Sequence, residues 1–435
     1  MSQATLRKRI DRLFWRAGFG PSPADRRTYV HAGYDAAVNH LLNPPTRNVL
    51  VGPRPVDDHN RPLKPTVEYG HDVLWWLDRM VRTRAPLVER MTLNLHDHFA
   101  TSNDGVGDAR LMLAQNRLLR RYALGNFGAL AHGILHDHAM QWWLSLIGSN
   151  RQSPNENFAR ELMELFTLGS GYTEHDIREA ARALTGFDYD WGKRRYFFNE
   201  DAHDTGVKKI FGHRGRYRPD DVVRLCLEHH AHPRFICSKI WSYFVPTPPS
   251  GRALAQMVRA YTRSNRELKP VLRVIFHSSA FYRSLEDPDM VKPPAVFLAG
   301  ALRAAKMPIR TRDWSWHLDN MGQRLFYPPN VGGWDQNESF LTTMSFKARS
   351  DAIGEILWKQ RFPDPQKPHR EPVSKSYDWA HRWAGEPLVR RATEAELYRI
   401  GAAFRPQWDQ DTHYTSARRR ILRHLLMAGP DAQVH

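Results

Sequence analysis

Three ionisable side chains from separate parts of the chain could hold a metal ion together. His98 lies in ERMTLNLHDHFAT, Glu161 in PNENFARELMELFTLG, and His203 begins HDTGVKK. Imidazole nitrogens and carboxylate oxygens are ligands that zinc, iron and manganese take in proteins. We therefore predict a divalent metal centre of His98, Glu161 and His203. Asp204 or Glu164 would act as a base or hydrogen-bond to a ligand, so Glu161, Glu164 and Asp204 are the candidate catalytic residues.

Each of these residues also has a structural interpretation. His98 falls on the apolar arc of its predicted helix, where a lone histidine is more often a satisfied core residue. Asp204 could close an Asx-turn on Gly206, or form an acid/base pair with His203. Glu161 stands at the apolar border of its helix, where partial burial would raise its pKa. The spacing does not decide between these interpretations, because HExxH is absent.

Candidate substrate-binding residues accompany the predicted centre. Asn157 and Arg160 share the helix of Glu161, Lys208 follows His203, and Phe326 and Trp334 flank PPNVG. The cations would suit an anionic group, and the aromatic rings would suit a sugar face. PPNVGGW could be a rigid loop that packs Trp334 or one wall of a pocket. We favour the rigid loop, because prolines stiffen the backbone and glycines let it turn.

The carboxylates need a helix to position them. Ser153 can cap its first turn, Pro154 suits the first helical position, and Glu156 completes a capping box with Ser153. Gly169 offers a left-handed end. The sequence therefore predicts an amphipathic helix over 154–168, with Glu156 and Arg160 paired one turn apart.

Amphipathic helical patterns continue along most of the chain. They cover 4–19, 22–43, 69–83, 86–100, 108–123, 126–146, 174–185, 219–229, 232–245, 251–263, 268–278, 292–305 and 344–359. Aromatic and polar residues alternate after residue 187, which favours a hairpin. We predict a mainly α-helical, bundle-like single domain over 1–435 with a small β-hairpin. Its irregular parts are a proline-rich loop at 44–66, the hairpin and His-Asp loop at 187–206, and a proline-rich charged loop at 362–376.

Composition narrows the partners and the setting. Among 435 residues, Lys and Arg outnumber Asp and Glu enough to give a formal net charge of +17. This charge favours a polyanion such as an anionic glycan, and nucleic acid is not excluded. No apolar run is long enough to cross a membrane, and the basic start of the chain lacks the apolar core of a secretory signal. We expect a soluble, cytoplasmic protein without a disulfide framework, since it has two cysteines.

Several segments occur in an order that is similar to a known bacterial family. They are RLFWRAGFGPSPAD, ERMTLNLHDHFAT, ALGNFGALAHGILHDHAM, PNENFARELMELFTLGSGYTEHDIREAARALTGF, HDTGVKKIFG and QRLFYPPNVGGWDQNESFL. Over about residues 10 to 355 the chain resembles the family called domain of unknown function 1800. The resemblance implies a mostly α-helical protein, often exported and often encoded beside a sulfatase-like protein, which is a candidate partner.

The chain departs from that family's pattern in three places. It lacks the export signal, it has LHDHF at 95–99 where relatives resemble WHNHF, and it has His138 where relatives usually carry proline. The phosphate-binding and nucleophile-elbow motifs GxxxxGK[ST], GxGxxG and GxSxG are absent.

Two functional hypotheses follow from the sequence. The first is a metal-dependent enzyme, a hydrolase before an oxidoreductase, that acts on an anionic or sugar-like substrate. The second is a non-catalytic binding or assembly protein for a polyanion or for a sulfatase-like partner. In the second hypothesis, arginines such as Arg160 and Arg182 satisfy the carboxylates.

Overall fold

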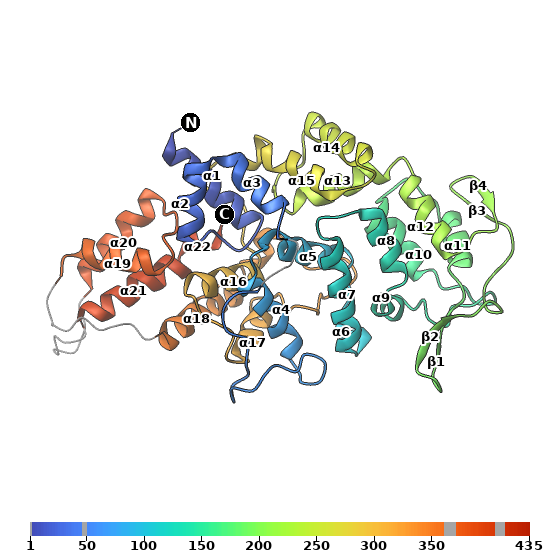
Figure 1. Ribbon diagram of the computed structural model, residues 1–435, viewed down its shortest axis with the longest axis horizontal. Coiled ribbons are helices and arrows are strands. Elements are labelled where there is room, and N and C mark those ends of the chain that lie inside the picture. The colour runs from blue at the N-terminus through green and yellow to red at the C-terminus, as the bar shows by residue number, and fades with distance from the viewer. Residues whose placement is uncertain (1, 46–49, 361–370, 405–413) are drawn as a thin grey trace.

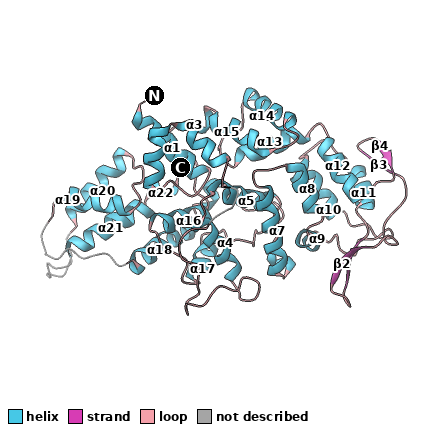
Figure 2. Cartoon of the chain, viewed as in Figure 1, coloured by secondary structure: helices cyan, strands magenta, loops and turns pink. Residues whose placement is uncertain are grey.

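Helices form most of the regular structure, as predicted (Figure 2). The computed structural model describes residues 2–45, 50–360, 371–404 and 414–435. The first half contains α1 (Gln3–Arg16), α2 (Pro23–Ala32), α3 (Tyr34–Leu42), α4 (His71–Arg82), α5 (Pro86–His98), α6 (Asn103–Val106), α7 (Ala109–Tyr122), α8 (Phe127–Leu135), α9 (His138–Trp143), α10 (Asn157–Glu161), the π-helix η1 (Leu162–Thr167) and α11 (Glu174–Ala183).

The second half continues with helices after two short hairpins. They are α12 (Pro219–Glu228), α13 (His232–Ser242), α14 (Gly251–Arg263), α15 (Leu268–His277), the 3₁₀ turn η2 (Ala280–Tyr282), α16 (Pro294–Ala304), α17 (Asp313–Asn320), η3 (Asn337–Phe340), α18 (Thr343–Lys359), α19 (Val373–Trp383), α20 (Arg391–Ala403), α21 (Tyr414–Ala428) and α22 (Pro430–Gln433). Within the described part of the chain, no helix has both the length and the apolar character needed to cross a membrane.

The apolar side chains gather in two clusters that meet at α5. One cluster contains Leu95 of α5 with residues of α8 to α15, and the other contains Leu93 with residues of α4 and α16 to α21. Every residue of α5 except Val88 is buried. Alternate faces of this central helix therefore serve both clusters (Figure 1).

Two antiparallel hairpins project at the end of the molecule opposite α19 and α20 (Figure 1). The predicted hairpin consists of β1 (Phe187–Asp190) and β2 (Arg195–Phe198), with Phe187 opposite Phe198. The second, β3 (Lys208–Ile210) with β4 (His213–Gly215), was not predicted from the sequence. Its three-residue strands are too short to show an alternating pattern.

The predicted helix over 154–168 differs in its beginning and in its second half. It begins at Asn157 without a side-chain cap, so the predicted capping box is wrong. Asn150 Oδ1 instead accepts the Ser153 N–H at 3.1 Å, which turns the chain before the helix. From Leu162 the helix widens to a π-helix, where the Leu168 N–H reaches back five residues at 2.9 Å. The predicted helix over 22–43 is also divided, because Gly33 takes a φ of 94°.

The last described residues return to the centre of the molecule and bind the segment before α16. The Lys292 N–H donates to the Gln433 carbonyl at 2.8 Å, and the His435 N–H donates to the Met290 carbonyl at 2.8 Å. Helices α19 to α21 pack beside α18 and α22 next to this junction (Figure 1). Of the predicted loop at 362–376, residues up to 370 lie outside the described residues, and α19 begins at Val373.

Candidate functional site

Two buried histidines bind the carbonyl end of the π-helix. The His98 Nε2–H donates to the Phe166 carbonyl at 3.0 Å, and the His232 Nδ1–H donates to the Thr167 carbonyl at 3.0 Å. Helix ends leave carbonyls that need donors when they are buried. Burial lowers the pKa of His98 to about 3 and that of His232 to about 4, so both rings are neutral at pH 7. His98 therefore has the structural role of a core histidine with a partner.

The His-Asp loop, residues 203–209, is held by hydrogen bonds to α11. His203 Nδ1–H donates to the Thr185 carbonyl at 2.9 Å, and Arg182 Nε donates to Asp204 Oδ2 at 2.7 Å. Asp204 Oδ1 accepts the Gly206 N–H at 2.8 Å, which is the Asx-turn considered from the sequence. Burial alone would raise the pKa of Asp204, but its bonds from Arg182 and Gly206 lower it below the usual value. Asp204 is therefore ionised and paired.

Lys208 lies inside the same loop and does not face a substrate. Its side chain has no exposed surface, and its amine is 3.7 Å from Asp204 Oδ1. The amine also donates to the carbonyls of Asp204 and Tyr217. Its predicted role as a contact for an anionic group does not fit this position, because the protein already provides acceptors for the buried charge.

The carboxylates of α10 and η1 lie on the outer side of the helix. Arg160 pairs with Glu156 at 3.2 Å, as predicted, and with a glutamate of α11 at 2.8 Å. Glu161 is half-buried, and burial together with the nearby Glu164 raises its pKa. Glu164 and Asn157 are exposed. Glu161 is thus the member of this group whose carboxylate differs most from a solvated one.

The structure does not bring the predicted metal ligands together. A metal site needs ligand atoms that converge, and His98, Glu161 and His203 are not a set with ligand atoms mutually within 4.8 Å. The described residues contain one such group of three, formed by Asp57, Glu68 and His71. Metal binding by the protein remains a prediction, while this particular ligand set is not supported by its geometry.

The hydrogen bonds of the Asp57 group do not fit a metal ion either. His71 Nδ1 accepts the Lys64 N–H at 3.0 Å, so the ring proton is on Nε2, which faces Glu68 at 3.4 Å. A metal ligand needs its lone pair at that nitrogen. Asp57 already pairs with Arg61 at 2.8 Å. The group therefore connects a loop to the start of α4, and its carboxylates are neutralised by Arg61 and Lys64.

The PPNVGGW segment packs against α5 rather than forming an open wall. Phe326 and Trp334 are buried, with ring centroids 5.8 and 5.6 Å from that of His96. The Trp334 N–H donates to Asp97 Oδ1 at 2.8 Å. Burial raises the pKa of Asp97 to about 6. These contacts support the structural interpretation that the sequence favoured for the segment.

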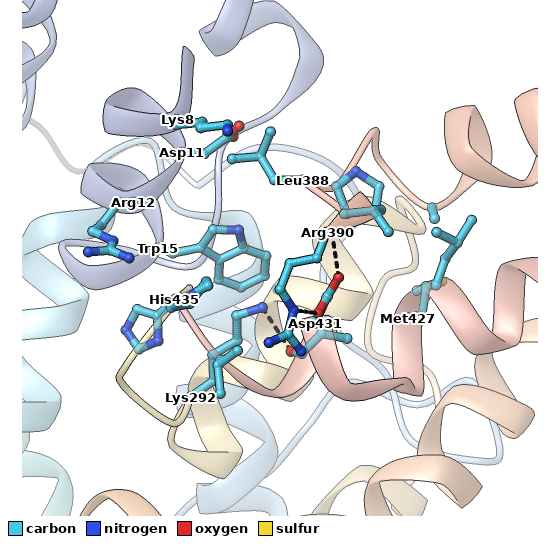
Figure 3. A pocket seen from close by; sticks show the side chains of 18 of the residues that line it. Lys8, Asp11, Arg12, Trp15, Lys292, Leu388, Arg390, Met427, Asp431 and His435 are labelled. Atoms are coloured by element: carbon cyan, nitrogen blue, oxygen red, sulfur yellow. Dashed lines mark hydrogen bonds and ion pairs between the residues drawn. The ribbon is translucent and has the colours of Figure 1, made fainter. Parts of the chain in front are cut away.

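A row of cavities lies between the body of the protein and its C-terminal helices. The first, of about 730 Å³, is lined by α1, α16 and residues 384–391 and 426–435 (Figure 3). The second, of about 890 Å³, is lined by the α1–α2 connection, the ends of α4 and α16, and residues 382–387. The third, of about 380 Å³, lies between the end of α16, α17 and the end of α18. We call this row the basic seam.

Shared residues connect the cavities of the basic seam. Trp15 and Ala304 line both the first and the second cavity, and Lys306 and Met307 line both the second and the third. Trp15 can occupy the first boundary because Gly300 lies under its ring, where a Cβ atom would be 2.5 Å from the indole. The three cavities are therefore neighbours in a series.

The basic seam carries cations that lack carboxylate partners. Its lysines and arginines outnumber its acidic residues. Some are neutralised, such as Arg390, which is 2.6 Å from Asp431. Among the described residues, five exposed cations of the seam have no ion pair, namely Arg84, Lys306, Arg310, Arg382 and Arg391. This surface can attract and hold an anion without breaking existing pairs.

The family described as a protein of unknown function (DUF1800) matches residues 12–434. The chain belongs to this family. The match confirms the resemblance and extends it to the C-terminal helices that line the basic seam, so the seam lies within the family's region. Neither a curated protein nor a solved structure matches the chain.

Sequence reasoning missed the seam because its residues come from distant segments. Trp15 lies in RLFWRAGFG, a segment that resembles the family's pattern. Lys292 is the single charged residue between Asp289 and Arg303. A lone lysine in an apolar stretch was a usable signal of a buried amine. Nothing in the spacing of Arg84, Lys306 and Arg382 indicates that they share one groove.

Proposed function

We propose that this protein binds an anionic glycan along the basic seam. The observation that carries the proposal is the set of exposed cations that line neighbouring cavities and have no ion pair among the described residues. Charges without protein partners remain available to carboxylate or sulfate groups, and partly enclosed cations interact more strongly with them than fully solvated ones. The proposal corresponds to the second hypothesis from the sequence, a non-catalytic binding protein for a polyanion.

The lining favours a sugar chain over a nucleic acid. Trp383 lines the second cavity and is 39% exposed, so its ring can contact a sugar face. Carboxylates of the seam, including Glu286 and Glu386, can accept hydrogen bonds from hydroxyl groups. A sugar chain carries free hydroxyl groups on its rings, whereas the backbone of DNA carries none between its phosphates. Three neighbouring cavities offer space for several linked units.

The satisfied His-Asp loop supports this choice over the metalloenzyme hypothesis. The binding hypothesis required the carboxylates to be paired with arginines, and Arg182 pairs with Asp204 while Arg160 pairs with Glu156. A metal-dependent hydrolase or oxidoreductase remains a prediction, as does a sulfatase-like protein partner. Elemental analysis of the variants below tests the metal-binding prediction.

Calorimetry with polygalacturonate, heparin, neutral dextran and single-stranded oligonucleotide tests the proposal. We expect binding of the carboxylated or sulfated polysaccharide, weakening as salt increases, and no binding of dextran. The triple variant Arg84→Glu, Lys306→Glu and Arg382→Glu should lose roughly 100-fold in affinity, since each exposed contact contributes about 1 kcal/mol. Tighter binding of the oligonucleotide than of either polysaccharide would replace the glycan by a nucleic acid.

A control variant with the same change in net charge distinguishes binding at the seam from a general effect of the protein's charge. Arg252→Glu, Arg259→Glu and Lys269→Glu change three exposed cations of α14 and α15, away from the seam (Figure 1). This control should retain most of the affinity, and an equal loss in both triple variants would refute a defined site. His203→Ala and Glu161→Ala should also retain affinity. Elemental analysis of the same variants tests metal binding, because stoichiometric zinc, iron or manganese lost in both would favour the enzyme.

A further inference from the structure

One buried amine in the first cavity of the basic seam is not explained by glycan binding. Lys292 is 4% exposed, and its Nζ lies 3.8 Å from the centroid of the Trp15 ring (Figure 3). The amine donates one hydrogen bond, to the Ala432 carbonyl at 2.8 Å. Among the described residues, no carboxylate forms an ion pair with it. A buried lysine without a carboxylate partner is unusual, because the isolated charge is costly.

The backbone on both sides of Lys292 fixes the position of the amine. Its N–H donates to the Gln433 carbonyl at 2.8 Å, and its carbonyl accepts from Arg349 Nη2 at 2.9 Å. Two prolines follow directly and begin α16, which restricts the backbone further. The side chain therefore extends from a rigid support into the cavity, a condition for precise attack on a bound group.

The groups around the amine favour its unprotonated form. Burial is the main cause that lowers the pKa of Lys292 to about 7, and the charge of Arg349 lowers it further. Asp431 and Asp11 act in the opposite direction but do not compensate for burial. The Trp15 ring acts in the same direction as these carboxylates, because its face attracts the protonated amine. The other charged or titratable residues that line the cavity are Lys8, Arg12, Glu286, Arg390, Arg391 and His435. The buried ring nitrogens of His435 have no hydrogen-bond partner among the described residues.

We propose that the Lys292 amine is a nucleophile that forms an imine with an aldehyde or keto group of an anionic ligand bound in the first cavity. The cavity walls supply what such a ligand needs. Leu388 and Met427 provide apolar contacts, and Arg391 is an exposed cation without an ion pair among the described residues (Figure 3). Glycan binding is not required, because a small carbonyl compound can occupy this cavity alone.

The reaction balances without an oxidant or reductant. The nitrogen lone pair attacks the carbonyl carbon, a C–N bond forms, and the carbonyl oxygen takes the proton that the nitrogen loses. The carbinolamine then loses its C–O bond as water, and the nitrogen lone pair forms the C=N bond. The leaving oxygen takes the second proton of the amine, so the step consumes no further acid or base.

Reductive trapping with glyoxylate and cyanoborohydride at pH 7 tests the proposal. Peptide mapping by mass spectrometry measures the labelling rate of every lysine in the same sample. An exposed lysine has about one amine in 2,500 unprotonated at pH 7, whereas a pKa of about 7 leaves roughly half unprotonated. We expect Lys292 to be labelled at least about tenfold faster than the exposed Lys193, Lys269 and Lys347, since a less basic amine is also less nucleophilic. Equal or slower labelling would overturn the proposal.

Two variants locate the reaction in the cavity. Leu388→Trp should fill the space beside Lys292 and slow its labelling about tenfold, while the exposed lysines keep their rates. Arg391→Ala should raise the glyoxylate concentration needed for half-maximal labelling, but not that of uncharged propionaldehyde. Lys292→Arg preserves the positive charge and should lose most of the protein's labelling at pH 7. If both cavity variants leave the rate at Lys292 unchanged, the amine reacts from solvent and the proposed site is wrong.

Discussion

Two regions of the molecule carry many ionisable groups, the His-Asp loop beside the hairpins and the basic seam beside the C-terminal helices (Figure 1). In the first, Asp204 pairs with Arg182, Lys208 is surrounded by acceptors, and His203 binds a carbonyl. In the second, Arg84, Lys306 and Arg382 are exposed without ion pairs among the described residues.

The difference separates groups that stabilise the fold from groups that remain available to a ligand. A charge that is already paired gains little from a ligand, because the existing bonds must be broken first. An unpaired charge beside a cavity incurs no such cost. The segments that are easiest to recognise in the sequence, around His98 and His203, belong to the first kind. We expect changes there to affect stability, and changes in the basic seam to affect binding.

Acidification should show the largest contrast. Burial lowers the pKa of His96, His98 and His232 to between about 3 and 4. Below pH 6.5 the unfolded chain takes up protons at these rings and the folded chain does not, so stability is lost as the pH falls. Each ring contributes at most about 1.4 kcal/mol per pH unit, and the raised pKa values of Asp97 and Asp137 act in the opposite direction. We expect a net loss of a few kcal/mol between pH 6.5 and 4.5 in urea denaturation.

Glycan affinity should change little over the part of that pH range in which the protein stays folded, because the guanidinium group in general keeps its charge far above neutral pH. His98→Gln keeps a donor for the Phe166 carbonyl and removes one titrating ring. In this variant the free energy of unfolding should fall less steeply with decreasing pH, by the equivalent of up to one proton taken up on unfolding. An unchanged slope would show that His98 is protonated in the folded state.

Asp204→Ala should cost about 3 kcal/mol of folding free energy, since it leaves the buried Lys208 amine without its carboxylate and removes one of the two carboxylates paired with Arg182. The neighbouring exposed Asp201→Ala is the control and should stay within about 0.5 kcal/mol of the wild type in the same denaturant titration. Folded Asp204→Ala protein should bind the glycan as the wild type does. A loss of affinity in this variant would show that the His-Asp loop contributes to binding, and would contradict its assignment to stability alone.

His98→Leu should cost about 2 kcal/mol, because the Phe166 carbonyl at the end of η1 loses its donor in a buried position. His98→Gln should restore part of this loss. Hydrogen exchange of the amides in η1 measures the local effect directly. If His98→Leu is as stable as the wild type, the histidine does not stabilise the π-helix.

Lys306→Glu should produce the smallest effect, a roughly fivefold loss of glycan affinity with unchanged thermal stability, because it is one exposed cation among several. It lines the boundary of the second and third cavities. Lys269→Glu has the same charge change on α15 and should leave the affinity within about twofold of the wild type. Equal losses would indicate an effect of net charge alone.

Much of the fold could be predicted from local patterns. Apolar periodicity located α4, α5, α7 and α11 to α16 to within a few residues, and the alternating aromatics located the hairpin at Phe187–Phe198. These features depend on residues close in the sequence. The capping box at Ser153 failed because Asn150 accepts the backbone N–H that the box requires. The π-helix was not predicted, and its last carbonyls are bound by His98 and His232, which come from distant segments.

The candidate site was less predictable. The sequence predicted correctly that His98 is buried and that Glu161 is half-buried. Their convergence could not be predicted, because α5, α10 and the His-Asp loop are placed by the packing of many apolar side chains. In the structure each of the two predicted histidine ligands binds a backbone carbonyl instead of a common centre.

The sequence by itself determined the helical class, the family and the excess of positive charge, because these depend on composition and on patterns within single segments. Only the tertiary structure decided which charges are paired and which are left beside a cavity. Ion pairs and cation–ring contacts depend on distances of a few ångströms between residues far apart in the sequence, such as Arg390 and Asp431 or Lys292 and Trp15. Those distances are set by the packing of the whole core.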